Sequence, residues 1–405
     1  MESIVEKIEI LLLVSALVAM VARKFQLPYS VGLVTAGIAL TFVQPFDLPF
    51  TKELIFTVLL PPLIFEAALF IRWKELRRDL PVILTFVTIG LSMAAAITAV
   101  GMHFMAGWSW APAIVFGILI AATDPVSVIA TFKEAGVHWR LRLLIEAESL
   151  MNDGTAAVGF TIAVAIATGV HALEAGGVIT TVLTTVLGGI ACGAGIAGAV
   201  LYIAGKTEDH MVEITFTTII AFGSFLVAEH FHFSGVLSCL TAGLVTGNFG
   251  FLGNISSRGR EAVTDFWEYA AFVANSLVFI LIGIHETEQN FMPVLGAAVI
   301  AIVLVTAGRA VAIYPCSLVY SRTGLRIDAK HQHVLFWGGL RGALALALAL
   351  GLPEEMPMRS EIVTVTFTVV AFSVFVQGLT MTPLLRFLGE LPKRSKASAS
   401  SENPS

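Results

Sequence analysis

The chain has 405 residues, of which 57% are hydrophobic and only 13% are charged, and its formal net charge is −5. A soluble domain carries about a quarter charged residues, because polar groups must cover its surface. The composition therefore excludes a water-soluble globule and indicates a protein that is partly solvated by lipid. The sequence has no long basic run, so we expect no nucleic-acid partner.

The cysteines and the N-terminus give two further expectations. Cys192, Cys239 and Cys316 lie far apart in apolar segments and form no CxxC pair, so neither a disulfide framework nor a thiolate metal site is indicated. We expect no cofactor. The first seven residues are mixed to acidic, and no Ala-x-Ala site follows, so the first apolar segment is expected to remain as a spanning helix.

Apolar runs between charged residues or Pro/Gly breaks predict an all-α polytopic membrane protein. A spanning helix needs about 20 mostly apolar residues, and about 13 such runs occur along the chain. In chain order they are approximately 8–22, 28–46, 54–71, 80–104, 111–132, 142–169, 177–204, 212–230, 233–250, 262–285, 292–320, 330–351 and 361–389.

Lys and Arg gather in alternate loops between these runs. Cytoplasmic loops carry an excess of these residues, so the pattern predicts a cytoplasmic C-terminus. The opposite side has only Lys7, Lys52 and Arg359. The polar, low-complexity segment 391–405 is predicted to be a disordered cytoplasmic tail.

Ionisable residues inside a membrane span are costly, so each one is a candidate for function. Four acids and two bases occur within the predicted spans, a composition that suits a cation pathway in which some acids are neutralised by partners. These six residues are Glu66, Asp124, Glu148, Asp153, Arg309 and Arg341.

The fifth run contains Thr123-Asp124-Pro125 near its middle. Proline removes a backbone donor and biases the preceding residue away from helical geometry, so we expect a break in the helix at Asp124. Such a break frees carbonyl groups, including that of Thr123, beside a carboxylate. Hard cations bind oxygen ligands of this kind. A proline kink with Asp124 capping the next half-helix is the structural alternative, and both can hold together.

The sixth run places Glu148 four residues before Asn152, and Ser149 four residues before Asp153. Residues four apart are neighbours on a helix, so these side chains form one polar patch on an apolar helix. This patch favours a functional site. Glu146 points elsewhere, towards the basic loop, and is expected to form an interfacial salt bridge.

The twelfth run contains Gly338, Gly339 and Gly342 around Arg341, and this glycine content predicts a second helix break. Broken helices in two halves of a chain indicate an inverted-repeat transporter, with the two interrupted helices crossing at the midplane. Arg309 either ties helix ends and carbonyls together or acts in transport directly. Glu66 either accepts protons or pairs with an arginine.

Three of these segments carry a resemblance to a known family. The segments 122–126, 148–154 and 338–343 resemble those of the sodium/proton antiporters of the cation:proton antiporter 1 family, which includes the NhaP-type antiporters. Residues 375–380, Phe-Val-Gln-Gly-Leu-Thr, look like the last helix of that family. The resemblance implies a homodimer in the plasma (inner) membrane. It also implies a core domain, about 80–169 and 292–389, that moves against dimerisation helices, about 8–71 and 177–285.

The resemblance also implies roles for individual residues. Asp124 and Asp153 would bind the cation and the proton, and Thr123, Ser149 and Glu148 would complete the Na⁺ site. Glu148 and Arg341, with Asn152, would form a stabilising ion-pair network, whereas the roles of Glu66 and Arg309 stay open. An Asn-Asp pair at 152–153 resembles that of electroneutral members of the family.

Together these observations predict a membrane antiporter within residues 1–390 that exchanges Na⁺ or Li⁺ for H⁺, one for one. Proton and cation are expected to compete for Asp124 and Asp153 as the core moves. A K⁺/H⁺ antiporter on the same scaffold is the nearest alternative, and a cation channel is a distant one. An intramembrane enzyme is not expected, because the sequence has no HExxH or GxSG motif.

Overall fold

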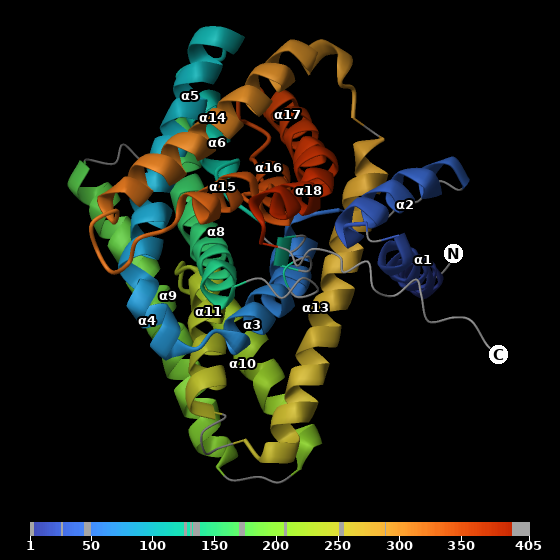
Figure 1. Cartoon of the computed structure of the whole chain (residues 1–405), viewed down its shortest axis with the longest axis vertical. Helices are drawn as coiled ribbons and strands as arrows, with labels where there is room; N and C mark the ends of the chain where they lie inside the picture. The colour runs from blue at the N-terminus through green and yellow to red at the C-terminus, as the bar shows by residue number, and fades with distance from the viewer. Residues whose placement is uncertain are drawn as a thin grey trace, which may run out of the picture.

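The computed structural model describes residues 4–25, 27–43, 50–124, 128–129, 132, 138–169, 175–205, 209–250, 255–287 and 289–390. Within these ranges the regular structure is helical throughout, and no strand occurs. The all-α class predicted from the apolar runs is therefore confirmed. Figure 1 shows the helices stacked along one long axis, with α9, α10 and α11 at one end and α5, α14 and α17 towards the other.

Seven helices are long and apolar enough to cross a membrane. They are Trp73–Ala106 (α4 Trp73–Thr85, η2 Phe86–Gly90 and α5 Leu91–Ala106), Trp139–Ala167 (α8), Gly177–Ala204 (in α9, Ala175–Ala204), His210–His230 (α10), Arg258–Glu286 (in α13, Ser257–Glu286), Met292–Val319 (η4 Met292–Val294 and α14 Leu295–Val319) and Arg359–Leu388 (α17 Arg359–Phe372, η5 Ser373–Gly378 and α18 Leu379–Leu388).

The remaining helices are not among these seven. Each of the predicted apolar runs coincides with a helical stretch in the described residues, while the number of membrane crossings stays a prediction. These remaining elements are α1 (Ile4–Phe25), α2 (Tyr29–Val43), η1 (Leu54–Leu59) with α3 (Leu60–Phe70), α6 (Trp110–Leu119), α11 (Gly235–Val245) with η3 (Thr246–Gly250), α15 (Ala329–Trp337) and α16 (Ala343–Leu350).

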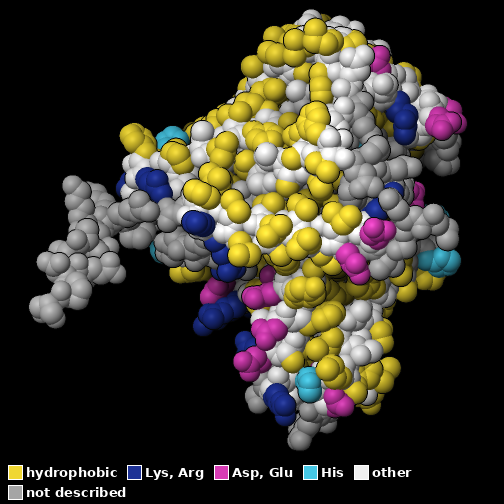
Figure 2. Space-filling view, turned by 90° about the vertical axis from the view of Figure 1, so that its right-hand side faces the viewer, with side chains coloured by type: hydrophobic (Ala, Val, Ile, Leu, Met, Phe, Trp, Pro, Cys, Tyr) yellow, Lys and Arg dark blue, Asp and Glu magenta, His cyan; other side chains and the backbone are white. Residues whose placement is uncertain are grey.

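The outer surface is apolar over wide areas. Phe42, Tyr202 and Phe387 are 83%, 86% and 87% exposed. Figure 2 shows hydrophobic side chains covering broad continuous areas of one face, between smaller groups of charged side chains. Exposed apolar area on this scale marks an interaction or membrane surface, and here it accords with the spanning helices.

Small residues let the helices approach closely. Gly37 of α2 faces Gly283 of α13, and a Cβ added at either position would meet backbone atoms of the other helix. Close approach through small residues is how helices associate in lipid, where apolar side chains gain little by leaving the solvent. The helices α2 and α13 thus pack directly against each other. In another part of the molecule, α5 packs against both α6 and α14.

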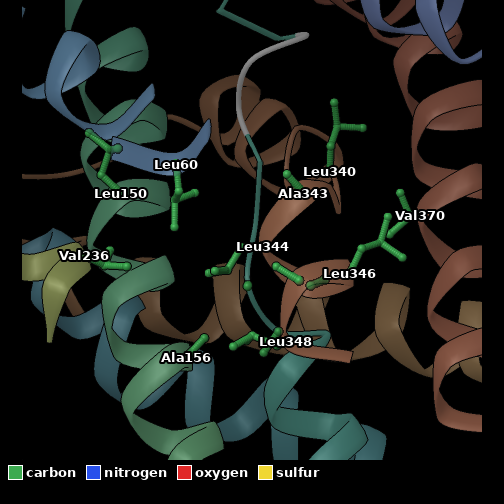
Figure 3. Packing of buried hydrophobic residues seen from close by; sticks show 14 of the residues in the cluster. Leu60, Leu150, Ala156, Val236, Leu340, Ala343, Leu344, Leu346, Leu348 and Val370 are labelled. Carbon is green, nitrogen blue, oxygen red and sulfur yellow. The ribbon is translucent and has the colours of Figure 1, made fainter. Parts of the chain in front are cut away.

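Two helices are interrupted, and the interruptions meet. The chain leaves α6 after Leu119 and is non-helical at 122–124; Pro125 lies outside the described residues. The second gap, 338–342, separates α15 from α16. The Asp124 N–H donates to the Leu340 carbonyl at 2.8 Å and so joins the two stretches, which we call the crossing. Figure 3 shows the non-helical segment that follows α6 running past Ala343 and Leu344.

Candidate functional site

The first half of the crossing is held by one face of α8. The Ser149 hydroxyl donates to the Thr123 carbonyl, and the Asn152 amide donates to the Ala121 carbonyl at 3.1 Å and to Thr123 Oγ1 at 3.2 Å. The two bonds to carbonyl groups satisfy backbone acceptors that the broken helix leaves without a helical partner, which is how irregular backbone persists at membrane depth. The polar patch predicted on this helix therefore positions the break itself.

Asp124 and Asp153 line one cavity of about 420 Å³. Thr123 and Leu150 form part of the same wall, while Ser149 and Asn152 lie behind it, bonded to the Thr123 stretch. One oxygen of Asp153, Oδ1, is buried and makes no hydrogen bond within the described part of the chain. The structure thus brings the two predicted carboxylates to a common space and leaves one of them an oxygen without a partner.

The same cavity is rich in acids. Five carboxylate side chains and one guanidinium line it, and we call it the acidic cavity. Its wall includes Glu66 from α3, Glu268 from α13 and Arg23 from α1. Glu66, whose role the sequence left open, therefore faces the space that holds Asp124 and Asp153. The remaining three acids are Asp124, Glu146 and Asp153.

Glu268 and Arg23 were not predicted from the sequence as site residues. Glu268 lies inside the predicted run 262–285, so the rule that flags ionisable residues in spans could have found it. Arg23 stands at the charged end of the first run, where a basic residue is ordinary and carries no signal. Only the packing of α1 and α13 around the cavity gives it a place in the site.

Glu148 pairs with Arg309 and not with Arg341. Arg309 donates from Nη1 and Nη2 to the two Glu148 oxygens at 2.6 and 2.8 Å, and Nη2 also reaches the Leu335 carbonyl at 2.9 Å. Both residues are buried. The ion pair expected between Glu148 and Arg341 is formed with Arg309 instead, and Arg341 Nη1 donates to the Gly339 carbonyl of its own turn at 2.7 Å.

This pairing also bears on Glu148 as a cation ligand. Both of its oxygens accept from Arg309, so neither faces the acidic cavity, whose lining omits Glu148. Arg309, by contrast, takes the structural role weighed for it, since it ties α8, α14 and the end of α15 together. Glu146 forms the expected salt bridge, 3.3 Å from Arg142, although it also reaches the acidic cavity.

The comparisons with known proteins agree with this architecture. The family model for the transmembrane part of sodium/hydrogen exchangers matches residues 10–387. The chain is 37% identical over 382 residues to the Na⁺/H⁺ antiporter ApNhaP of Aphanothece halophytica, covering 93% of this chain and 73% of that protein. It is 35% identical over 377 residues to the low-affinity Na⁺/H⁺ antiporter NhaS1 of Synechocystis, covering 91% and 72%. The chain belongs to the sodium/hydrogen exchanger family.

A solved structure shows the same fold. The sodium proton antiporter MjNhaP1 from Methanocaldococcus jannaschii superposes with a TM-score of 0.77 over 95% of this chain and 98% of that one, at 19% identity. Membership in the exchanger family makes this protein an integral membrane transporter and not an enzyme. The family resemblance carried by the segments at 122–126, 148–154 and 338–343 is thereby confirmed.

The arrangement of side chains in the described residues does not resemble a binding site for a resident metal ion. Within the described ranges, no group of three or more His, Cys, Asp or Glu side chains could hold a resident metal ion. Two carboxylates beside a backbone carbonyl oxygen instead offer hard oxygen ligands, which suit a hard cation.

Proposed function

We propose that this exchanger moves Na⁺ or Li⁺ in one direction and H⁺ in the other by alternating access. The observation that carries the proposal is the pair Asp124 and Asp153 on one cavity wall, with a buried Asp153 oxygen that has no partner in the described structure. A carboxylate oxygen binds either a proton or a hard cation. Ions that share these two side chains therefore compete, and competition is sufficient for exchange.

Thr123 and Ser149 supply the further ligands in this proposal. The Ser149 hydroxyl donates a hydrogen bond to the Thr123 carbonyl oxygen, next to Asp124 in the chain. A cation that enters could bind this carbonyl oxygen alongside the hydroxyl, or it could take the place of the hydroxyl proton at the carbonyl oxygen. Glu148 is better placed as the anionic partner of Arg309 than as a ligand. Glu66 would meet the cation earlier, on the opposite wall of the acidic cavity.

The charges at the crossing favour a one-for-one exchange. Glu148 and Arg309 cancel each other. Arg341 is buried and forms no ion pair within the described residues, so in this proposal its charge is assigned to offset one of the two aspartates. The ionised, unloaded site then carries one negative charge, which a single monovalent cation or a single proton neutralises. Moving a bare charge through a low-dielectric barrier costs several kcal/mol, so only the loaded forms cross readily.

A homodimer with a moving core domain is also part of the proposal, on the basis of the family resemblance. Residues about 80–169 and 292–389 would form the moving core, and residues about 8–71 and 177–285 the dimerisation helices of a homodimer. The Lys- and Arg-rich loops support a cytoplasmic C-terminus in this proposal. The proposed location is the plasma membrane. Segment 391–405, the predicted tail, lies outside the described residues.

Reconstituted vesicles test the proposal. A pH gradient across proteoliposomes should collapse on addition of Na⁺ or Li⁺. Asp124→Asn and Asp153→Asn should each abolish that response while the protein elutes as a folded species. Glu354→Gln, which changes an exposed acid outside the acidic cavity, is the matched control and should retain wild-type exchange.

Ion selectivity and charge balance are read in the same vesicles. A larger response to K⁺ than to Na⁺ would replace the proposal by K⁺/H⁺ exchange. Rates that change with an imposed membrane potential would exclude one-for-one exchange. Wild-type exchange by either aspartate variant would remove that residue from the mechanism.

A further inference from the structure

A second, much smaller cavity lies beside the crossing. It measures about 10 Å³ and is bounded by α14, the non-helical turn at 339–341 and the π-helical turn η5. It shares none of its lining residues with the acidic cavity. Because two buried arginines, Arg309 and Arg341, form part of its wall, we call it the arginine cavity.

Four polar side chains in this wall have unused hydrogen-bonding groups. The Nε atoms of Arg309 and Arg341 are buried without a partner in the described structure, and the residues are 6% and 2% exposed. Ser373 and Gln377, 2% and 6% exposed, line the same cavity, and their side chains make no hydrogen bond within the described ranges. A buried polar group without a partner is costly, so the two buried Nε atoms call for an occupant.

One residue of the 375–380 motif, Gln377, lines the arginine cavity, together with Ser373 two residues before the motif. Both belong to the π-helical turn η5, and π-helical turns are rare and frequently lie at functional sites. The other residues of this turn are apolar or glycine. Packing alone would favour a larger aliphatic side chain at either position.

We propose that the arginine cavity binds one water molecule that bridges Arg341 and Arg309 to Ser373 and Gln377. A water accepts two hydrogen bonds and donates two, and the wall offers two Nε–H donors and two side-chain oxygens as acceptors. The cavity volume of about 10 Å³ is the room that one water requires.

Charge decides between a water and a halide ion. Glu148 already neutralises Arg309. In the charge balance of the proposed function, Arg341 offsets one of the aspartates of the acidic cavity. Once a cation or a proton is bound there, the crossing is neutral. A halide ion in the arginine cavity would then leave a buried net charge, which is unfavourable in a low-dielectric interior. A neutral occupant avoids this cost.

The water has a consequence for exchange, and this step rests on the proposed function. It gives the Arg341 Nε–H a hydrogen-bond partner without adding an anion, so the guanidinium charge remains available to balance the aspartates. Gln377 is accordingly a positioning residue: it holds the water and touches no transported ion.

Direct imaging tests the site without any transport measurement. A structure of the full chain at a resolution that reveals ordered water should show one peak within hydrogen-bond distance of Arg341 and Gln377. A crystal grown in bromide should show no anomalous peak there. A bromide peak would assign the cavity to an anion, and absence of any density would overturn the proposal.

Thermal unfolding gives a second, independent readout. Ser373→Ala removes one partner of the water and should lower the Tm by a few degrees. Thr306→Val is the matched control, because Thr306 lines the same cavity but its hydroxyl already bonds the Ile302 carbonyl at 2.8 Å. It should leave the Tm unchanged. Equal losses in the two variants would contradict a water held by Ser373.

Gln377→Glu separates positioning from packing. A carboxylate at this position would pair with Arg341, leave the loaded site negatively charged, and make the exchange rate depend on an imposed membrane potential. Gln377→Met removes the hydrogen bonds but adds no charge, so any residual exchange should stay independent of the potential. Potential-independent exchange by Gln377→Glu would refute the charge argument, while the imaging result would still decide the water site.

Discussion

Glu148 and Arg309 form a closely matched pair of charges in the membrane-spanning core. The guanidinium reaches both carboxylate oxygens, at 2.6 and 2.8 Å, and 161 residues of chain separate the two side chains. Each charge is buried, so neither could remain ionised at this depth without the other. The pair thus joins α8 to α14 and keeps Glu148 away from the transported cation.

Single substitutions of this pair should be more harmful than its removal. Glu148→Leu or Arg309→Met alone leaves an unpaired buried charge, and we expect each to destabilise the protein by about 3–5 kcal/mol. The double variant should recover most of that loss, because two apolar side chains of similar size replace the ion pair. Thermal unfolding of the four proteins in detergent measures the coupling.

The same set of single and double variants can be made with Arg341 in place of Arg309, as a comparison. If Glu148 and Arg341 were partners, Arg341→Met would be rescued by Glu148→Leu in the same way. The structure gives Arg341 a carbonyl partner in its own turn, so we expect no rescue. Rescue of Arg341→Met, with none for Arg309→Met, would show that the pairing has been assigned to the wrong arginine.

At the scale of elements, the crossing depends on a glycine at its second half. A Cβ added to Gly342 would lie 2.5 Å from Asp124 Cβ and 2.6 Å from Asp124 Cγ, closer than real Cβ contacts occur. Asp124 sits beside the start of α16 only because position 342 has no side chain. The two broken helices are therefore fitted to each other at the residue that is proposed to bind the ion.

Gly342→Ala should displace Asp124 and slow exchange. Misplacing a reacting group by about 1 Å can cost on the order of a hundredfold in rate, and we expect a loss of that order here. Gly296→Ala in α14 is the control, since nothing lies within 4 Å of its added Cβ. The control should retain wild-type exchange and gain slightly in stability. Unchanged exchange by Gly342→Ala would show that the close approach does not matter.

The sequence predicted the elements well because each has a local cause. Lengths of apolar runs located the helices, and Asp124-Pro125 and the glycines around Arg341 located the two breaks. The partner of Glu148 had no local cause: Arg309 and Arg341 both lie in apolar runs, and only packing decides which one reaches α8. The same holds for Arg23, which meets the acidic cavity through the packing of distant helices.

At the scale of the whole molecule, the acidic cavity has two walls of different origin. The crossing and α8 supply Asp124, Asp153 and Glu146, whereas helices near the N-terminus and α13 supply Arg23, Glu66 and Glu268. Arg23 and Glu268 are exposed, and neither forms an ion pair within the described residues. Such charges act on an arriving cation through solvent, and their effect should depend on sign and on ionic strength.

Substitution of these two residues should therefore shift the KM for Na⁺ in opposite directions. A unit charge at about 10 Å in water contributes about 0.4 kcal/mol, or roughly a twofold change in local cation concentration. Glu268→Gln should raise the KM about twofold and Arg23→Gln should lower it by a similar factor, with the maximal rate preserved because neither side chain binds the ion at the crossing. Initial rates in proteoliposomes at low ionic strength measure both constants.

Ionic strength then distinguishes this electrostatic effect from a change in structure. Added choline chloride shortens the Debye length from about 30 Å at 0.01 M to about 3 Å at 1 M, so both shifts should vanish as salt rises. A rearranged cavity would keep its altered KM at every salt concentration, and two shifts of the same sign would exclude the electrostatic explanation. Opposite shifts that disappear with salt would identify the acidic cavity as the route by which cations reach Asp124 and Asp153.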